Sequence, residues 1–84
     1  MYFVYVLYSQ KFDKKYVGMT ADLEKRLAEH NAGFTKSTKP FVPWKVIYLE
    51  KFSFRSEARN REKYFKSASG RRYLKKYVII NLAS

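Results

Sequence analysis

The run YFVYVLYS at Tyr2–Ser9 limits the possible folds of this 84-residue chain more than any other segment. Its β-branched and aromatic side chains favour a strand, and the run is too short for an independent helix. Because both of its faces are apolar, we expect this strand in the middle of a sheet. The turn-forming sequence QKFDK and a short return strand at Lys15–Gly18 follow it. Residues 2–18 are therefore predicted to form a β-hairpin.

A helix is predicted directly after the hairpin. Thr20 is its expected N-cap, and Asp22 in the first turn is favourable against the helix dipole. We expect the helix to run to about His30, where the tripeptide NAG at 31–33 would end it.

The second half of the chain predicts one more strand and two more helices. A polar, basic loop that holds both prolines leads to a strand at Trp44–Glu50. Ser53 is expected to open a helix over roughly Phe54–Ser67, and Ser69-Gly70 to break it before a short helix in RRYLKKY. The order β-β-α-β-α-α predicts one α/β (α+β) domain over residues 1–84, in which helices flank a small sheet.

The charge balance indicates a polyanionic partner. Eighteen Lys and Arg oppose seven Asp and Glu, a formal net charge of +11, and phosphate contacts dominate nucleic-acid affinity. Residues 51–76 hold ten of these cations and two acids, which gives +8. On charge alone, a ribosome-associated protein, a membrane-surface protein and a solvated basic domain stay open as alternatives. The candidate phosphate contacts are Lys36, Lys39, Lys63, Lys66, Arg71, Arg72, Lys75 and Lys76.

The composition excludes several kinds of site. With no cysteine and one histidine, the chain has no disulfide framework, no thiolate zinc site and no multi-histidine metal site. No apolar run approaches the roughly 20 residues that span a bilayer. The N-terminus lacks the basic region and cleavage site of a signal peptide. We therefore expect a cytoplasmic protein with no membrane partner.

Two polar side chains share one flank of the first predicted helix. Arg26 and His30 lie one turn apart, at the border between the stripe of Leu23 and Leu27 and the surface. For either residue alone, a structural role is the simpler explanation, with Arg26 extending past the core and His30 hydrogen-bonded.

Glu62 is the sharper anomaly, on the second predicted helix. It falls in the same narrow arc as Phe54, Ala58 and Phe65, where a carboxylate is costly unless it is paired or binds a cation. A buried ion pair with Arg26 or another cation is the structural alternative.

Tyr5 and Tyr16 lie on adjacent strands of the predicted hairpin. Tyrosine is common in strands, so core packing explains each of them when taken alone. Gly18 follows the return strand and could allow a ligand or a helix to approach the backbone closely.

Together these residues resemble the GIY-YIG nuclease superfamily, and the chain is similar to its short stand-alone bacterial members. The resemblance is carried by Tyr5, Tyr16-Val17-Gly18, Arg26, His30 and Glu62. It extends over nearly the whole chain, through VYVLYS, KYVGMT, LEKRLAEHN, PWKVIY and REKYFKSASGRRYLK. It implies a three-stranded antiparallel sheet flanked by helices, with a single-metal phosphodiesterase site on the face of the sheet.

The resemblance also implies a role for each residue. Tyr5 and Tyr16 match the tyrosines of the two signature motifs, and Arg26 matches the arginine of the helix. Glu62 matches the metal-binding glutamate, and His30 matches a position near the attacking water.

The chain departs from the family pattern at three places. Phe3-Val4-Tyr5 stands where Gly-Ile-Tyr would, and Met19 stands where some repair-nuclease relatives carry lysine. An asparagine that some relatives place one helix after the glutamate has no clear match, and Leu74 is near that spacing. These departures bear on the catalytic rate more than on the fold.

The residue types suit phosphodiester hydrolysis. One Mg²⁺ or Mn²⁺ ion held by Glu62 and waters would neutralise charge on the phosphate and the leaving oxygen. Arg26 offers a bidentate fork to the scissile phosphate. Tyr16 would be the general base if nearby positive charge made its phenol more acidic, with His30 or Tyr5 completing a proton relay.

We therefore expect a metal-dependent endonuclease that cleaves DNA rather than RNA. The basic residues would position the substrate without reading its sequence, so we expect selection of a branched, nicked or single-stranded structure. Sequence-specific cutting would need a partner protein. The leading rival hypothesis is a non-catalytic nucleic-acid-binding module, and the third is a protein-interaction adaptor.

Overall fold

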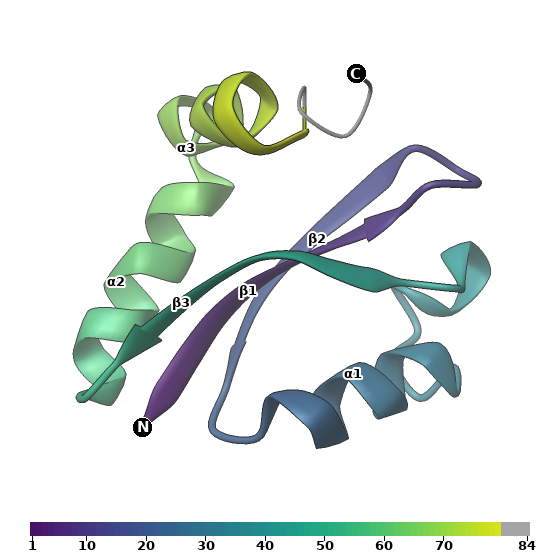
Figure 1. Cartoon of the computed structure of the whole chain (residues 1–84), viewed down its shortest axis with the longest axis horizontal. Helices are drawn as coiled ribbons and strands as arrows, with labels where there is room; N and C mark the ends of the chain where they lie inside the picture. Colours follow the sequence, from purple (N-terminus) through teal and green to yellow (C-terminus); the bar gives the residue numbers. More distant parts are fainter. Residues whose placement is uncertain (80–84) are drawn as a thin grey trace.

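The computed structural model describes residues 1–79, which form a three-stranded antiparallel sheet flanked by helices (Figure 1). The strands β1 (Tyr2–Ser9), β2 (Lys14–Thr20) and β3 (Lys45–Phe52) lie in the order β2-β1-β3. The apolar run at Tyr2–Ser9 is therefore the central strand, and the predicted α+β fold is confirmed. No helix within residues 1–79 is long and apolar enough to cross a membrane.

The central strand sends its side chains alternately to the two faces of the sheet. Val4 and Val6 join one buried cluster, while Tyr5 and Leu7 join another, and each is at most 2% exposed. Tyr5 pairs directly with Gly18 of β2, so the phenol and the glycine are neighbours across the hairpin.

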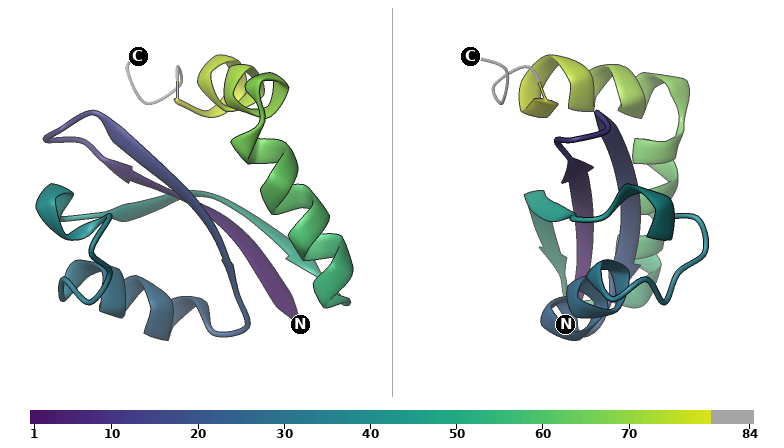
Figure 2. Two further views of the ribbon diagram at one scale, coloured as in Figure 1. Left: turned by 180° about the vertical axis from the view of Figure 1, so that it is seen from behind. Right: turned by 90° about the vertical axis from the view of Figure 1, so that its right-hand side faces the viewer.

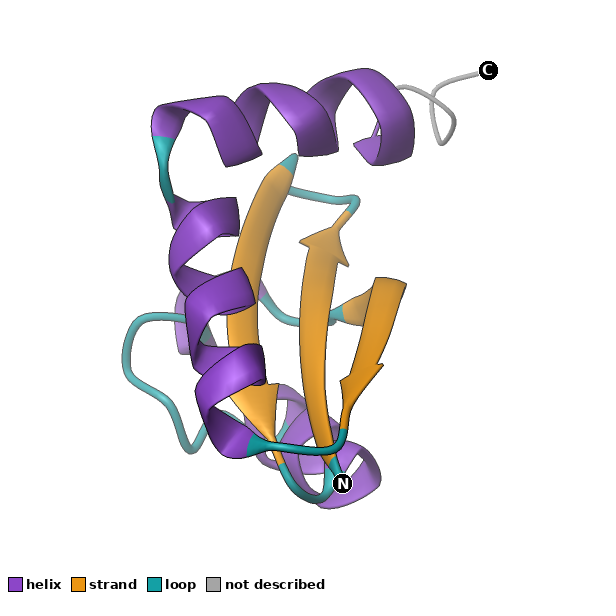
Figure 3. Cartoon of the chain, turned by 90° about the vertical axis from the view of Figure 1, so that its left-hand side faces the viewer, coloured by secondary structure: helices purple, strands orange, loops and turns teal. Residues whose placement is uncertain are grey.

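Helices cover the two faces of the sheet separately (Figure 2). The helices α2 (Arg55–Lys66) and α3 (Ala68–Leu74) pack on the face of Val4 and Val6, and α1 (Leu23–Asn31) packs on the face of Tyr5. Figure 3 shows α2 beside the edge strand β2. Side chains of α1 and α2 can therefore meet around this edge of the sheet.

The N-cap of α1 is Asp22, so the prediction of Thr20 is wrong. The Asp22 carboxylate accepts the Lys25 N–H at 3.2 Å. Thr20 is the last residue of β2, and its hydroxyl accepts the Asp22 N–H at 3.1 Å. The threonine is used in the turn before the helix. At the other end Gly33 adopts a φ of 82°, the left-handed conformation that glycine allows.

The start of α2 also differs from the prediction. Phe54 is the N-cap rather than Ser53, and its N–H donates to the Glu57 carboxylate at 3.3 Å. Phe54 is 68% exposed, so it does not belong to the buried arc that Ala58 and Phe65 form.

The break between α2 and α3 lies at Ser67, not at Ser69-Gly70. The Ser67 hydroxyl accepts the Gly70 N–H at 3.2 Å and caps α3. Gly70 is inside α3, where a Cβ atom would collide with the main chain of Tyr64 and Phe65. Glycine is needed here for close packing rather than to end a helix. A π-helical turn at Lys75–Ile79 continues α3.

An ion pair fixes α2 against the sheet. Arg61 donates from Nε and from Nη2 to the Glu50 carboxylate of β3, at 2.9 and 3.2 Å. The Tyr48 hydroxyl donates to the same carboxylate at 2.6 Å. The Arg61 guanidinium also lies 4.5 Å from the centre of the Phe65 ring. This network sets how α2 is rotated on the sheet, and hence where Glu62 points.

Candidate active site

A pocket of about 390 Å³ opens along the edge strand β2. Four of the five predicted catalytic residues line it, each from a different element. They are Tyr5 of β1, Tyr16 of β2, Arg26 of α1 and Glu62 of α2. Gly18 also lines the pocket, whereas His30 does not. The edge of the sheet thus gathers side chains that come from both of its faces.

Gly18 makes room for the phenol of Tyr5. A Cβ atom at this position would lie 2.6 Å from Tyr5 Cζ and still closer to the hydroxyl. The predicted close approach to the Gly18 backbone is therefore made by Tyr5, within the protein itself.

The Tyr5 phenol is neutral at physiological pH. Burial raises the pKa of Tyr5 to about 12, and the neighbouring Arg26 guanidinium offsets this only in part. The ring centres of Tyr5 and Tyr16 lie 6.4 Å apart, so the two phenols are neighbours in the pocket.

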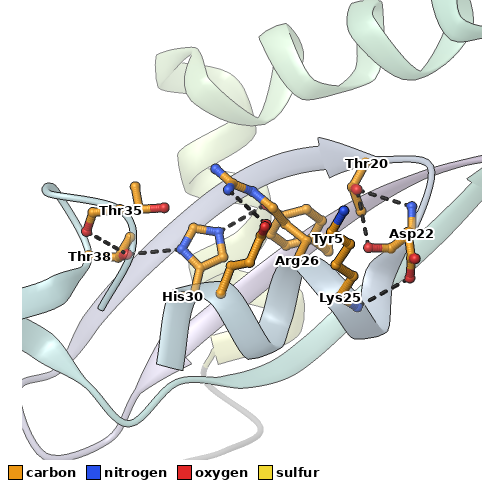
Figure 4. Close-up of polar contacts among 9 residues, drawn as sticks. Tyr5, Thr20, Asp22, Lys25, Arg26, His30, Thr35 and Thr38 are labelled. Carbon is orange, nitrogen blue, oxygen red and sulfur yellow. Dashed lines mark hydrogen bonds and ion pairs between the residues drawn. The ribbon is translucent and has the colours of Figure 1, made fainter. Parts of the chain in front are cut away.

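His30 lies behind Tyr5 and is fully buried, not at the border that the helical periodicity predicted. Figure 4 shows it between Tyr5 and Thr38. Its Nε2 is 3.1 Å from the Tyr5 hydroxyl, and its Nδ1 is 2.9 Å from the Thr38 hydroxyl. Thr38 belongs to the loop before β3, which helical periodicity cannot place over α1.

The hydrogen bonds determine the His30 tautomer. The Thr38 hydroxyl donates to the Thr35 carbonyl at 3.3 Å, so it accepts from Nδ1–H of His30. The bare Nε2 then accepts the Tyr5 hydroxyl proton. Burial, and then the charge of Arg26, lower the pKa of His30, which keeps the ring neutral. Tyr5 therefore directs its proton inward to His30.

Arg26 is a half-buried cation in the pocket. Its Nη1 lies 3.3 Å from a Glu29 oxygen on the same helix, and its side chain is 34% exposed. A pair this exposed contributes little to stability. The Arg26 guanidinium retains further N–H groups that can bind a phosphate.

The ionic contacts of Glu62 with other described residues are long. Its side chain is 13% exposed, and its carboxylate oxygens lie 3.9 Å from Arg59 Nε and 3.4 Å from Lys66 Nζ. Both partners are more than half exposed, so these pairs are weak. The structural alternative is a pairing with Arg26 or another cation. Arg26 pairs instead with Glu29, and the cations that Glu62 contacts are Arg59 and Lys66.

This donor set fits a hydrated hard cation. Mg²⁺ is commonly held by one or two carboxylates, waters and the substrate phosphates. Within residues 1–79 no three His, Cys, Asp or Glu side chains gather into a metal-binding group. One nearly buried carboxylate in an open pocket is thus the arrangement that the protein offers.

Arg55 and Arg59 line the pocket but were not among the predicted site residues. With Glu62 they recur at i, i+4 and i+7, which places all three on one face of α2. This spacing is visible in the sequence, and it indicates that Arg55 and Arg59 share the helix face of Glu62. Tyr2 also lines the pocket, and nothing in its local sequence distinguishes it.

The eight predicted phosphate contacts are all exposed, and none lines this pocket. Lys66 and Arg71 line a neighbouring pocket, and Lys75 lines a third. The others outside the active-site pocket are Lys36, Lys39, Lys63, Arg72 and Lys76.

Comparison with known proteins gives matches of family, sequence and structure. Residues 1–77 match the family model described as the GIY-YIG catalytic domain. A UPF0213 protein of Listeria welshimeri is 48% identical over 69 residues, covering 81% of this chain and 76% of the relative. One from Staphylococcus haemolyticus is 38% identical over 78 residues, covering 88% and 90%. The solution NMR structure of the Bacillus halodurans UPF0213 protein has a TM-score of 0.54 at 26% identity, covering 90% of this chain and 84% of that one.

Proposed function

The chain belongs to the GIY-YIG catalytic domain family, and from that premise we propose that it is a divalent-metal-dependent endonuclease. The family implies a nuclease and a nucleic-acid substrate. We further propose that the substrate is DNA, selected by structure rather than sequence. The observation that supports this most is that Tyr5, Tyr16, Arg26 and Glu62 line one open pocket.

Glu62 is the residue that would hold Mg²⁺ or Mn²⁺. When bound, the ion supplies Lewis-acid stabilisation of the charge that develops on the phosphate and the leaving oxygen. Its charge would also strengthen phosphate binding in a pocket that Arg26, Arg55 and Arg59 already make positive.

Arg26 is proposed to bind the scissile phosphate. Its guanidinium can donate two parallel hydrogen bonds to non-bridging oxygens, which both orients the phosphate and stabilises the transition state. Arg55 and Arg59 on the facing helix would hold the neighbouring phosphates.

Tyr16 is the candidate general base, and Tyr5 is a positioning residue. The Tyr5 proton points to His30 and its pKa is about 12, so this phenol does not accept a proton at physiological pH. Its oxygen would instead accept a hydrogen bond from the neighbouring Arg26 and orient the guanidinium. His30 would act through Tyr5 rather than on the attacking water, because it does not line the pocket.

A cleavage assay with matched variants tests this function. Supercoiled, branched and single-stranded DNA would be incubated with the protein in Mg²⁺, in Mn²⁺ and in chelator. We expect metal-dependent nicking that falls at least about 100-fold in Glu62→Gln and in Arg26→Gln. Glu24→Gln, an exposed acid of α1 outside the pocket, should cleave as the wild type does.

The outcome that overturns the enzyme is DNA binding by all these proteins with no cleavage in either metal. That result would favour the non-catalytic binding module. Absence of salt-sensitive binding to any nucleic acid would favour the protein-interaction adaptor.

A further inference from the structure

A second pocket adjoins the candidate active site along β2. It has a volume of about 440 Å³ and shares Tyr16 with the first pocket. The other lining residues come from β2, α2 and α3, and they are Lys15, Val17, Phe65, Lys66 and Arg71. The proposed nuclease chemistry at Glu62 assigns no role to this pocket.

The second pocket combines an apolar floor with a cationic rim. The half-buried ring of Tyr16 and the edge of Val17, 7% exposed, form the floor, with the fully buried Phe65 beneath them. Lys15, Lys66 and Arg71 form the rim, and no carboxylate is among the described lining residues. Sites for single-stranded nucleic acid combine these two features, because a nucleotide has an apolar base and an anionic phosphate.

The lowered pKa of Lys15 reflects its burial and, after that, a concentration of positive charge at this end of β2. Burial first, and then the charges of Arg71 and Lys75, lower its pKa. Lys15 and Lys75 also line a third pocket, together with Tyr8, Asp13 and Ile79. Asp13 there accepts a hydrogen bond from the Tyr8 hydroxyl at 2.6 Å. The cations thus continue along β2 away from Glu62, and their mutual repulsion would be relieved by a polyanion.

We propose that the second pocket binds a nucleotide of a single-stranded segment of the substrate, with Lys15 and Arg71 contacting its phosphate. This inference rests on the proposed function, which defines the scissile phosphate at the first pocket. Gly18 and Lys15 are three residues apart on β2, about 10 Å. The bound nucleotide would therefore lie close to the scissile phosphate along the same strand.

The single-stranded state follows from the apolar floor. A nucleotide can place its base or sugar over Tyr16 and Val17 only when the base is unpaired and unstacked. A duplex keeps its bases paired and stacked, so it cannot occupy this pocket and should depend little on Lys15 and Arg71.

Binding in chelator tests the inference without cleavage. Fluorescence anisotropy would compare a labelled 12-nucleotide oligothymidine with a 12-base-pair duplex, across a salt series. For Lys15→Gln/Arg71→Gln we expect at least 10-fold weaker single-strand binding. The slope of log K against log salt should fall by about 1.4, the value for two lost phosphate contacts on a single strand.

The control variant Lys25→Gln/Lys51→Gln loses the same charge at exposed positions outside both pockets. It should weaken binding less than 2-fold. Equal losses in the two double variants would overturn the inference, because the effect would then be one of net charge. A loss for the duplex as large as that for the single strand would also overturn it.

Two further measurements separate folding and function from the pocket. Lys15→Arg/Arg71→Lys keeps both charges and should retain wild-type affinity, while thermal melting checks that every variant is folded. If the pocket variant alone loses binding but the wild type cleaves nothing, the inference stands and the proposed endonuclease fails. If the wild type cleaves and the pocket variant binds and cleaves like the control, the proposed endonuclease stands. The inference that the second pocket binds a nucleotide is then wrong.

Discussion

At the scale of single residues, the contact between Gly18 and Tyr5 determines the shape of the site. In Gly18→Ala the new Cβ atom would meet the Tyr5 ring, so the phenol must leave its place. We expect a loss of about 1–3 kcal/mol in the free energy of unfolding, measured by urea denaturation. The same change in a Tyr5→Leu background should cost less, because the shorter side chain removes the clash. Equal costs in both backgrounds would contradict this packing.

The His30 tautomer is a second residue-scale prediction. Long-range ¹H–¹⁵N NMR spectra should show Nδ1 of His30 protonated and Nε2 bare in the wild type, because Thr38 accepts from Nδ1. Thr38→Val removes that acceptor, so the tautomer protonated at Nδ1 is no longer favoured over the other. We expect the free energy of unfolding to fall by about 1–3 kcal/mol. A wild-type spectrum with Nε2 protonated would contradict the arrangement in which Tyr5 donates to His30.

The buried histidine also predicts a pH dependence of stability. The pKa of His30 is lowered in the folded protein, below its ordinary value of about 6.5, so the unfolded chain takes up this proton first. The neutral form of His30 contributes its full stability above the unfolded-state pKa of about 6.5. This contribution is lost as the pH falls from there toward the folded-state pKa. Urea unfolding from pH 8 to pH 5 should therefore show a steeper decline for the wild type than for His30→Gln. Parallel curves would mean that His30 is not perturbed.

The sequence predicted that four residues share the pocket, but not the contacts that depend on the folded loops and helix faces. The order of Tyr5, Tyr16, Arg26 and Glu62 in the sequence allowed a shared site to be expected, and all four line one pocket. The burial of His30 depends on Thr38, a loop residue whose position no local pattern determines. Arg55 and Arg59 were not predicted, because the net charge of residues 51–76 does not show which cations share a face of the helix.

At the scale of elements, the ion pair of Arg61 with Glu50 holds α2 in the rotation that directs Glu62 to the pocket. Arg61→Met removes two hydrogen bonds to a carboxylate that is 21% exposed, and should cost about 1–3 kcal/mol. The rate of DNA cleavage should fall as well, although Arg61 does not line the active-site pocket. Lys51→Met, at an exposed lysine of β3 outside the pocket, loses the same charge; it is the control and should change neither. Unchanged cleavage in a destabilised Arg61→Met protein would show that the pair does not position Glu62.

The elements themselves were predictable where the signal is local. The strand at Tyr2–Ser9 matches the prediction because its apolar run is a property of the segment alone. Helix ends were shifted, since Asp22 and Phe54 take the caps expected of Thr20 and Ser53. Gly70 was misjudged as a helix breaker because its contact with Tyr64 is a tertiary one.

At the scale of the whole molecule, the site exists because helices on opposite faces of the sheet reach around one edge strand. Arg26 comes from the face of α1, Glu62 from the face of α2, and β2 contributes Tyr16 between them. The net charge of +11 gives the molecule as a whole a positive field that favours polyanionic partners. A small, strongly basic fold thus places one nearly buried carboxylate in a pocket that three arginines also line.

The most direct test is the single-turnover rate of DNA cleavage in Mg²⁺, measured for the wild type and for Glu62→Gln on the nucleic-acid structure that the wild type prefers. The proposed site predicts cleavage by the wild type and a rate at least about 100-fold lower for the variant, with both proteins folded and binding DNA. Equal rates for the two proteins, or no cleavage by a wild type that binds DNA, would contradict it.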